Sequence, residues 1–330
     1  MKQHDLNRFT TEYLAYLLLA VIMLLPLIIH SPYYFHIMIL SGIYIILAIG
    51  LNIITGYCGQ INLGMAGFYA VGAYTSAVLA TRLGLSFWLA LPASALTAAI
   101  TGFVIGVPAL KVKGGVYLVL VTVSFAGIVR VILNQWVSLT KGPMGIVGIP
   151  APQIGKFVFF ARPHWFYLVY AVVLLVTFLA SRLVNSRIGR SFVALRESEV
   201  SAQSIGINPA FYKVLAFVYS AALAGVAGSL YAHYMTTVSP DVFDFNLSVL
   251  ALMMIVVGGI GSIPGSILGG VALAIVPEWL RAFGSFQTIV YALGVILAVI
   301  FLPTGLLTLG INATQFLAGR FSQPRAEGRA

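Results

Sequence analysis

No aspartate or glutamate occurs between Glu12 and Glu197, and this gap constrains the fold more than any other feature of the sequence. Apolar runs fill most of the gap, and a helix needs roughly 17–25 such residues to cross about 30 Å of hydrocarbon. Of the 330 residues only 8% are charged and 60% are hydrophobic, whereas a soluble domain carries about 25% charged residues. So few charged residues could not cover the surface of a soluble protein of this size. The sequence therefore predicts an all-α polytopic membrane protein.

The apolar runs predict about ten transmembrane segments. With ten spans and the N-terminus inside, twelve Lys and Arg residues fall on the inner side and five on the outer side, which is the bias of a cytoplasmic inner side. Nine spans would place the basic C-terminal tail outside, so both termini are expected in the cytoplasm. The eighth span is short, and it could form one broken helix with the ninth. The spans are expected near residues 13–29, 34–54, 61–80, 86–110, 116–133, 165–181, 212–232, 246–258, 265–281 and 286–303.

The composition also excludes several classes of function. The net charge of +10 lies mostly in loops between apolar runs, which fits a membrane protein and no nucleic-acid partner. No metal-ligand spacing, hydrolase motif or phosphate-binding loop occurs, so neither catalysis nor a metal or nucleotide site is expected. No linker with the composition of a domain boundary interrupts the chain. Residues 1–330 are therefore predicted to form one membrane domain.

Two glycine-rich stretches occupy comparable positions in the two halves of the chain, at 56–67 and 258–270. Interrupted helices at membrane depth are tolerated where they are buried or line a wet cavity, and paired interruptions point to a transport site between repeats. Close helix packing through small residues is the alternative. The residues predicted to line a translocation path are Gly56, Gly59, Gln60, Asn62, Gly64, Gly258, Gly259 and Gly261.

Two loops are long. The inner one, 182–211, contains LRESEVSAQSIGINP, in which Ser198 can cap a short helix of about two turns and Gly206 can end it, with Pro209 beyond. A solvated connector at the membrane surface is the alternative for this loop. The outer one, about 134–164, is rich in Gly and Pro and is expected to form turns.

Charged residues inside the spans are rare. Glu278 is the one carboxylate that falls in a span, beside Trp279 near its end, and this scarcity of acidic residues argues against coupling to an ion gradient. Arg130 lies near the outer end of the fifth span, where reaching toward the lipid headgroups is favoured over contact with a substrate carboxylate.

Several motifs occur in one order along residues 40–280: 51–67, Lys113-Gly-Gly-Val-Tyr-Leu, Thr140-Lys-Gly-Pro-Met-Gly-Ile, 194–208 and 258–270. In these the chain resembles the permease subunits of bacterial branched-chain amino acid ABC importers, of the LivM type. Asn62 and Met65 depart from that pattern, where Ser and His are usual. Thr140, Gly142 and Gly145 fall in the motif of the outer loop, which the resemblance makes periplasmic.

The resemblance implies a bacterial inner-membrane protein that pairs with a second, LivH-like permease subunit. Two cytoplasmic ATP-binding subunits would hydrolyse ATP, so this chain would hold no cofactor, and a periplasmic binding protein would deliver the substrate. Permeases of this kind dock on the ATPase through a loop with an E-A-A…G pattern, for which Glu199, Ala202 and Gly206 stand in, while Ser201 replaces an Ala. The residues expected to couple the loop to the ATPase are Glu197, Glu199, Ser201, Ala202 and Gly206.

Two further possibilities stay open. A permease of the same type could carry urea or short-chain amides in place of branched-chain amino acids. A self-sufficient passive channel or secondary carrier would need no ATPase at all, and transport by the isolated chain would reveal it.

Overall fold

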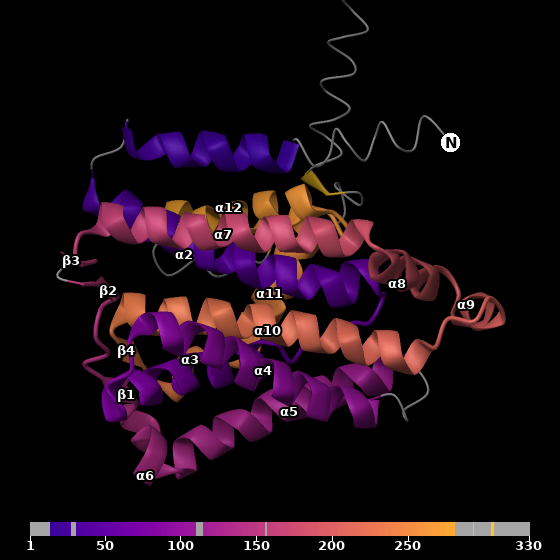
Figure 1. Cartoon of the computed structure of the whole chain (residues 1–330), viewed down its shortest axis with the longest axis horizontal. Helices are drawn as coiled ribbons and strands as arrows, with labels where there is room; N and C mark the ends of the chain where they lie inside the picture. The colour runs from indigo at the N-terminus through magenta and orange to yellow at the C-terminus, as the bar shows by residue number, and fades with distance from the viewer. Residues whose placement is uncertain are drawn as a thin grey trace, which may run out of the picture.

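The computed structural model describes residues 14–27, 31–109, 115–155, 157–280, 293 and 305–306. Its helices run side by side as a bundle, and its strands are short (Figure 1). Helices occur at nine of the ten predicted spans, and the tenth, near 286–303, lies almost wholly outside the described residues. Five helices are long and apolar enough to cross a membrane: Pro32–Tyr57, Phe87–Pro108, Tyr117–Gln135, Arg162–Asn185 and Pro209–Met235.

The helices follow the apolar runs closely. A helix Leu14–Leu24 comes first and is followed by the single turn η1 (Leu25–Leu27). The remaining helical elements are α2 (Pro32–Leu51), η2 (Asn52–Tyr57), α3 (Met65–Arg82), α4 (Phe87–Ala109), α5 (Gly115–Gln135), α6 (Val137–Thr140), η3 (Gly142–Met144), α7 (Arg162–Asn185), α8 (Arg187–Glu197), α9 (Glu199–Ser204), α10 (Pro209–Met235), η4 (Pro240–Val242), α11 (Phe245–Gly258) and α12 (Ile263–Trp279).

Short strands and a short helical loop mark the two opposite ends of the bundle. At one end, β1 (Ile146–Val147) pairs antiparallel with β4 (Thr237–Val238), and β2 (Gln153–Ile154) pairs with β3 (Phe157–Val158). At the other end, α8 and α9 project beyond the bundle (Figure 1). We call these the strand end and the α9 end.

The centre of the bundle is held together by small residues. Helix α10 packs against α2, α3 and α4, and a side chain at Gly72 of α3 would overlap the backbone of Gly225 in α10. A side chain at Gly225 would in turn overlap the carbonyl of Ser94 in α4. Backbones that approach this closely gain dispersion contacts, which drive helix association where lipid surrounds the bundle. Close packing through glycine therefore also occurs outside the two predicted glycine-rich stretches.

Helices α4 and α5 lie at the edge of the bundle. In an apolar stretch of 18 residues taken from each helix, 28% of the residues of α4 and 33% of those of α5 are buried, against 89% for α2 with η2. Leu96, Ile100 and Phe103 of α4 are each more than half exposed. Apolar exposure on this scale requires lipid or another protein surface.

The structure answers one open question and differs from the sequence-based expectation in one feature. The predicted eighth and ninth spans are separate helices, α11 and α12, because a turn of four residues, Gly259–Ser262, reverses the chain between them. The inner loop contains α8 as well as the short helix that Ser198 begins. Helix α8 buries Phe192 and Leu195 and begins at a cap, because the Ser186 hydroxyl accepts hydrogen bonds from the Ile188 and Gly189 nitrogens.

Candidate functional site

The first glycine-rich stretch is a break between two helices. Helix α2 changes into the π-helix η2 at Asn52, and the chain then runs without regular structure until α3 begins at Met65. Gly59 within the break has φ +73°, which glycine adopts without strain. A π-helix of this kind is rare and frequently marks a functional site.

The second stretch forms the turn between α11 and α12. Gly259 and Gly261 have φ of +130° and +78°, and the Ser262 hydroxyl caps α12 by accepting a hydrogen bond of 3.2 Å from the Gly265 nitrogen. Gly258 lies where α11 packs closely on α12, because a side chain there would overlap the carbonyl of Gly265. Of the predicted path residues, Gly258 thus holds two helices together, and Gly259 and Gly261 shape the turn.

Asn52 joins the two breaks. Its amide nitrogen donates to the Ser262 carbonyl at 2.8 Å and to the Ser266 hydroxyl at 2.7 Å. Its amide oxygen accepts a hydrogen bond of 2.8 Å from the Gly261 nitrogen. The side chain is buried, so these three bonds satisfy a polar group that would otherwise be costly inside the bundle. Sequence reasoning missed Asn52, although an amide within an apolar span is the signal that singled out Gln60 and Asn62.

Arg196 reaches the same junction from the α9 end. Its Nη1 donates a hydrogen bond of 2.5 Å to the Gly56 carbonyl. A Cβ at Gly59 would lie 3.1 Å from the Arg196 Cγ, and a Cβ at Gly261 would lie 2.7 Å from its Nη1. One side chain of α8 therefore lies against three of the predicted path glycines, one of them in the second break. A Cβ at Gly59 or Gly261 would crowd this side chain, and both residues have the positive φ that favours glycine.

Gln60, Asn62 and Gly64 of the first stretch make contacts of their own. Gln60 takes part through its backbone, donating to the Ile54 carbonyl at 3.0 Å and accepting from the Thr55 hydroxyl at 3.0 Å. Gly64 packs against α5, where a Cβ at Gly64 would lie 2.7 Å from the Thr122 carbonyl. The Asn62 oxygen accepts from the Gly64 nitrogen at 2.8 Å, and its buried amide nitrogen has no partner among the described residues.

The short helix of the inner loop, α9, has the ends that the sequence predicts. The Ser198 hydroxyl accepts a hydrogen bond of 3.2 Å from the Ser201 nitrogen, which caps the first turn. Gly206 has φ +85°, and the Gly206 and Ile207 nitrogens donate to the Gln203 and Ala202 carbonyls, as in a Schellman motif. Arg196 and Glu197 belong to α8, and the new helix begins at Glu199, directly after the Ser198 cap.

The side chains of α9 divide into a fixed set and an exposed set. Glu199 forms a salt bridge of 2.7 Å with Lys213 of α10, and Ala202 is buried. Ser201 and Gly206 are exposed, as are the apolar side chains of Val200 at 78% and Ile205 at 74%. Two apolar side chains held in solvent at the tip of a capped helix suit a protein partner. The sequence motif pointed to Glu199 as a contact, whereas the structure uses its carboxylate within the chain.

The outer-loop residues form a compact turn at the strand end. The Thr140 hydroxyl donates to the Leu133 and Trp136 carbonyls at 2.7 and 2.8 Å, and the Gly142 nitrogen donates to it at 3.2 Å. Gly142 and Gly145 both have positive φ, and a side chain at Gly145 would overlap the Val238 carbonyl. These residues therefore build the turn, at the end of the bundle opposite Arg196 (Figure 1).

Arg130 also lies near the strand end. Its Nη2 stands 3.0 Å from the Asp241 Oδ1 of η4, and both side chains are partly exposed. Sequence reasoning favoured contact with lipid headgroups for Arg130, and the structure adds an ion pair with a carboxylate 111 positions later in the chain.

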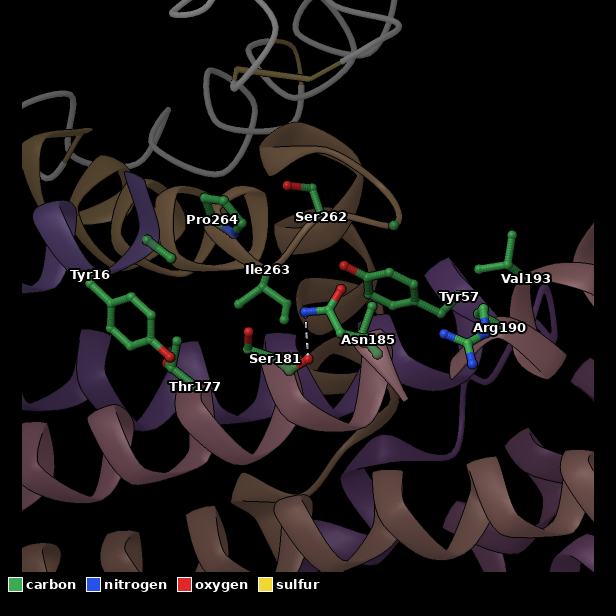
Figure 2. A pocket seen from close by; sticks show the side chains of 13 residues that line it. Tyr16, Tyr57, Thr177, Ser181, Asn185, Arg190, Val193, Ser262, Ile263 and Pro264 are labelled. Carbon is green, nitrogen blue, oxygen red and sulfur yellow. Dashed lines mark hydrogen bonds between the residues drawn. The ribbon is translucent and has the colours of Figure 1, made fainter. Parts of the chain in front are cut away.

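A cavity of about 400 Å³ adjoins the turn between α11 and α12. It lies between the helix Leu14–Leu24, α7, α8 and the start of α12 (Figure 2). Gly261 and Ser262 form part of its wall. No cluster of three or more metal-ligating side chains occurs among the residues that the structure describes.

Comparison with known proteins gives one consistent family. Residues 33–303 match the model of the family described as "Branched-chain amino acid transport system / permease component". The chain is 38% identical over 291 residues to the high-affinity branched-chain amino acid transport system permease protein LivM of Escherichia coli, covering 81% of this chain and 68% of that one. It is 30% identical over 287 residues to the corresponding protein LivH of Salmonella typhimurium, covering 81% and 92%.

A more distant relative is the probable branched-chain amino acid transport permease protein LivM of Methanocaldococcus jannaschii, 25% identical over 291 residues, with 77% of this chain and 82% of that one covered. No solved structure matches. The family model covers most of the chain and includes both breaks, Arg196 and α9. The chain therefore belongs to the family of permease components of branched-chain amino acid transport systems.

Proposed function

We propose that this chain is one of two permease subunits of an ATP-driven importer of branched-chain amino acids in the bacterial inner membrane. The second permease would be LivH-like, two cytoplasmic subunits would bind and hydrolyse ATP, and a periplasmic protein would deliver the substrate. The family and the names of the LivM and LivH relatives support this assignment. The α9 end would face the cytoplasm, where the cations of α8 obey the positive-inside rule.

One contact carries the mechanism: the hydrogen bond between Arg196 and the Gly56 carbonyl. Helix α9 would dock on an ATPase through Val200 and Ile205, and residue 198 alone separates α9 from α8, which carries Arg196. A displacement of α9 is therefore transmitted to η2 directly, and to the Gly259–Ser262 turn through the contact with Gly261. Both breaks would move together, as alternating access requires.

The transport path would run beside these two breaks. The dipoles of helix ends at such breaks suit the carboxylate and ammonium of an amino acid. The buried amide nitrogen of Asn62, which has no partner among the described residues, is a further donor available to a substrate.

The test is to express the chain with its genomic neighbours, purify the complex through this subunit, and measure ATP hydrolysis and uptake in proteoliposomes. If the chain belongs to an importer, an ATPase and a second permease co-purify with it. The rate of ATP hydrolysis by this complex then rises when substrate-loaded binding protein is added. Uptake of leucine, isoleucine and valine is compared with that of urea and acetamide. Transport by the chain alone without ATP would overturn the proposal, whereas preference for urea would change only the substrate.

A further inference from the structure

The cavity beside α7 has the position of a membrane-surface site. Helix α7 is one of the five helices able to span a membrane, and it ends at Asn185. The cavity follows the last turns of this helix, from Thr177 to Asn185 (Figure 2). The cavity therefore extends from the end of this predicted span toward the apolar middle of the helix. Tyr16 and Tyr57 line it as well, and tyrosine is enriched at this depth of a bilayer.

The chemistry of its wall favours an anion with an apolar part. Among the described residues no carboxylate lines the cavity, whereas Arg190 of α8 lines it. The Arg190 guanidinium makes no hydrogen bond or ion pair with the described residues. Figure 2 shows it beside Asn185, at one end of the cavity. Val184 and Ile263 also line the cavity, and Figure 2 shows Ile263 between this guanidinium and the opposite end.

The opposite end holds a polar atom without a partner. Thr177 is fully buried, and its hydroxyl has no hydrogen bond with the described residues. An unpaired buried hydroxyl costs free energy that a hydrogen-bond acceptor in the cavity would recover. The cavity thus offers a cation at the surface and a donor at depth, separated by an apolar wall.

We propose that this cavity binds an anionic membrane phospholipid. Its phosphate pairs with Arg190, a glycerol-ester oxygen accepts a hydrogen bond from Thr177, and the start of an acyl chain lies along Val184 and Ile263. Basic pockets between membrane helices on the cytoplasmic side recognise anionic headgroups in this way. A free phosphate ion would satisfy Arg190, but it would leave both the apolar wall and the Thr177 hydroxyl without a partner.

The site touches the junction described above. Gly261 and Ser262 belong both to the wall of the cavity and to the turn that Asn52 holds. A bound lipid therefore packs against the turn that Arg196 also contacts. Any effect of the lipid on transport rests on the proposed function, whereas lipid binding itself does not.

The experiment uses the full chain in the complex in which it purifies, with thermal unfolding and lipid mass spectrometry as readouts. Phosphatidylglycerol is expected to raise the unfolding temperature, and phosphatidylcholine and inorganic phosphate are not. Arg190→Gln should weaken the apparent phosphatidylglycerol affinity about fivefold, the effect of one cation near an anionic lipid surface. Arg187→Gln is the matched control, because Arg187 is an exposed cation of the same helix outside the cavity.

Thr177→Val gives an independent readout, because it removes the hydroxyl and keeps the shape of the side chain. It should lower the amount of co-purified phosphatidylglycerol without removing the charge. Equal effects of Arg187→Gln and Arg190→Gln would overturn the proposal in favour of general surface charge. Stabilisation by inorganic phosphate alone would overturn the assignment of a lipid ligand and would indicate a site for a free anion.

Discussion

The guanidinium of Arg196 and the carbonyl of Gly56 are joined by a hydrogen bond of 2.5 Å across 140 positions of the chain. The donor belongs to a helix at the edge of the bundle, and the acceptor belongs to the π-helix that ends α2. Because a hydrogen bond from a charged donor is about twice as strong as a neutral one, it is suited to transmitting a movement between the two segments.

Replacing Arg196 with Gln should uncouple ATP hydrolysis from uptake. The variant loses the charge-assisted bond to Gly56, worth about 1.5–3 kcal/mol, while the helices that carry it stay packed. We expect normal membrane levels and ATP hydrolysis with uptake reduced at least severalfold, measured in proteoliposomes. Arg196→Lys keeps one charged donor and should retain part of the uptake. Full uptake by Arg196→Gln would rule out this route of coupling.

Asn52→Leu should destabilise the chain. It removes three hydrogen bonds and leaves the Gly261 nitrogen and the Ser266 hydroxyl without that partner, for a cost of about 3 kcal/mol. The measurement is thermal unfolding in detergent. Asn134→Leu is the control, because its side chain makes one bond to the Arg130 carbonyl within its own helix. Equal shifts in the two variants would contradict a special role for Asn52.

Val200→Asp should release the ATPase subunit without affecting the fold. The side chain is 78% exposed, so its replacement leaves the free energy of unfolding within about 0.5 kcal/mol. A charge at the centre of a docking surface should abolish co-purification of the ATPase. Phe160→Asp makes the same change on an 80% exposed side chain near β3, at the strand end, and should have no effect on that assay.

Gly206→Val should strain the end of α9. The residue has φ +85° and nothing lies within 4 Å of a Cβ there, so the cost is conformational, about 1–2 kcal/mol. Gly206→Asn should be milder, because Asn adopts this conformation more readily. We expect more ATP hydrolysed per amino acid imported in the Val variant, with membrane insertion unchanged. An unchanged ratio would show that the shape of this turn is unimportant for coupling.

Gly72→Ala should weaken the packing of α3 on α10. The added methyl group would overlap the Gly225 backbone, and overpacking of this kind costs about 1–3 kcal/mol. Gly127→Ala is the matched control, since nothing lies within 4 Å of a Cβ at that position. The prediction is a lower unfolding temperature for Gly72→Ala alone, and the reverse order would contradict the packing described above.

Local chemistry explains which parts of this fold the sequence could predict. Ser198 and Gly206 act on neighbours within a few positions, and the ends of α9 were therefore predictable. The two breaks were visible because glycine interrupts an apolar run. Their contact with each other was not, because Asn52 meets Gly261 across 209 positions.

Long-range charge pairing was equally hidden. The partner of Arg130 is Asp241, and no spacing within the sequence links the two. Glu199 matched a docking motif, yet its carboxylate is held by Lys213. The exposed Val200 and Ile205 had no signal of their own, because an apolar residue in an apolar chain stands out only when its exposure is known.

The central position of α2 has a consequence for biosynthesis. This helix is the most deeply buried of the five candidate spans, yet α10, against which it packs, is made more than 150 residues later. During that interval α2 has lipid around it and helices made before α10, such as α7. It is also the most apolar of the five, as a helix must be if it is to wait in the bilayer before its partners arrive. Its composition therefore records the order of synthesis as well as its final surroundings.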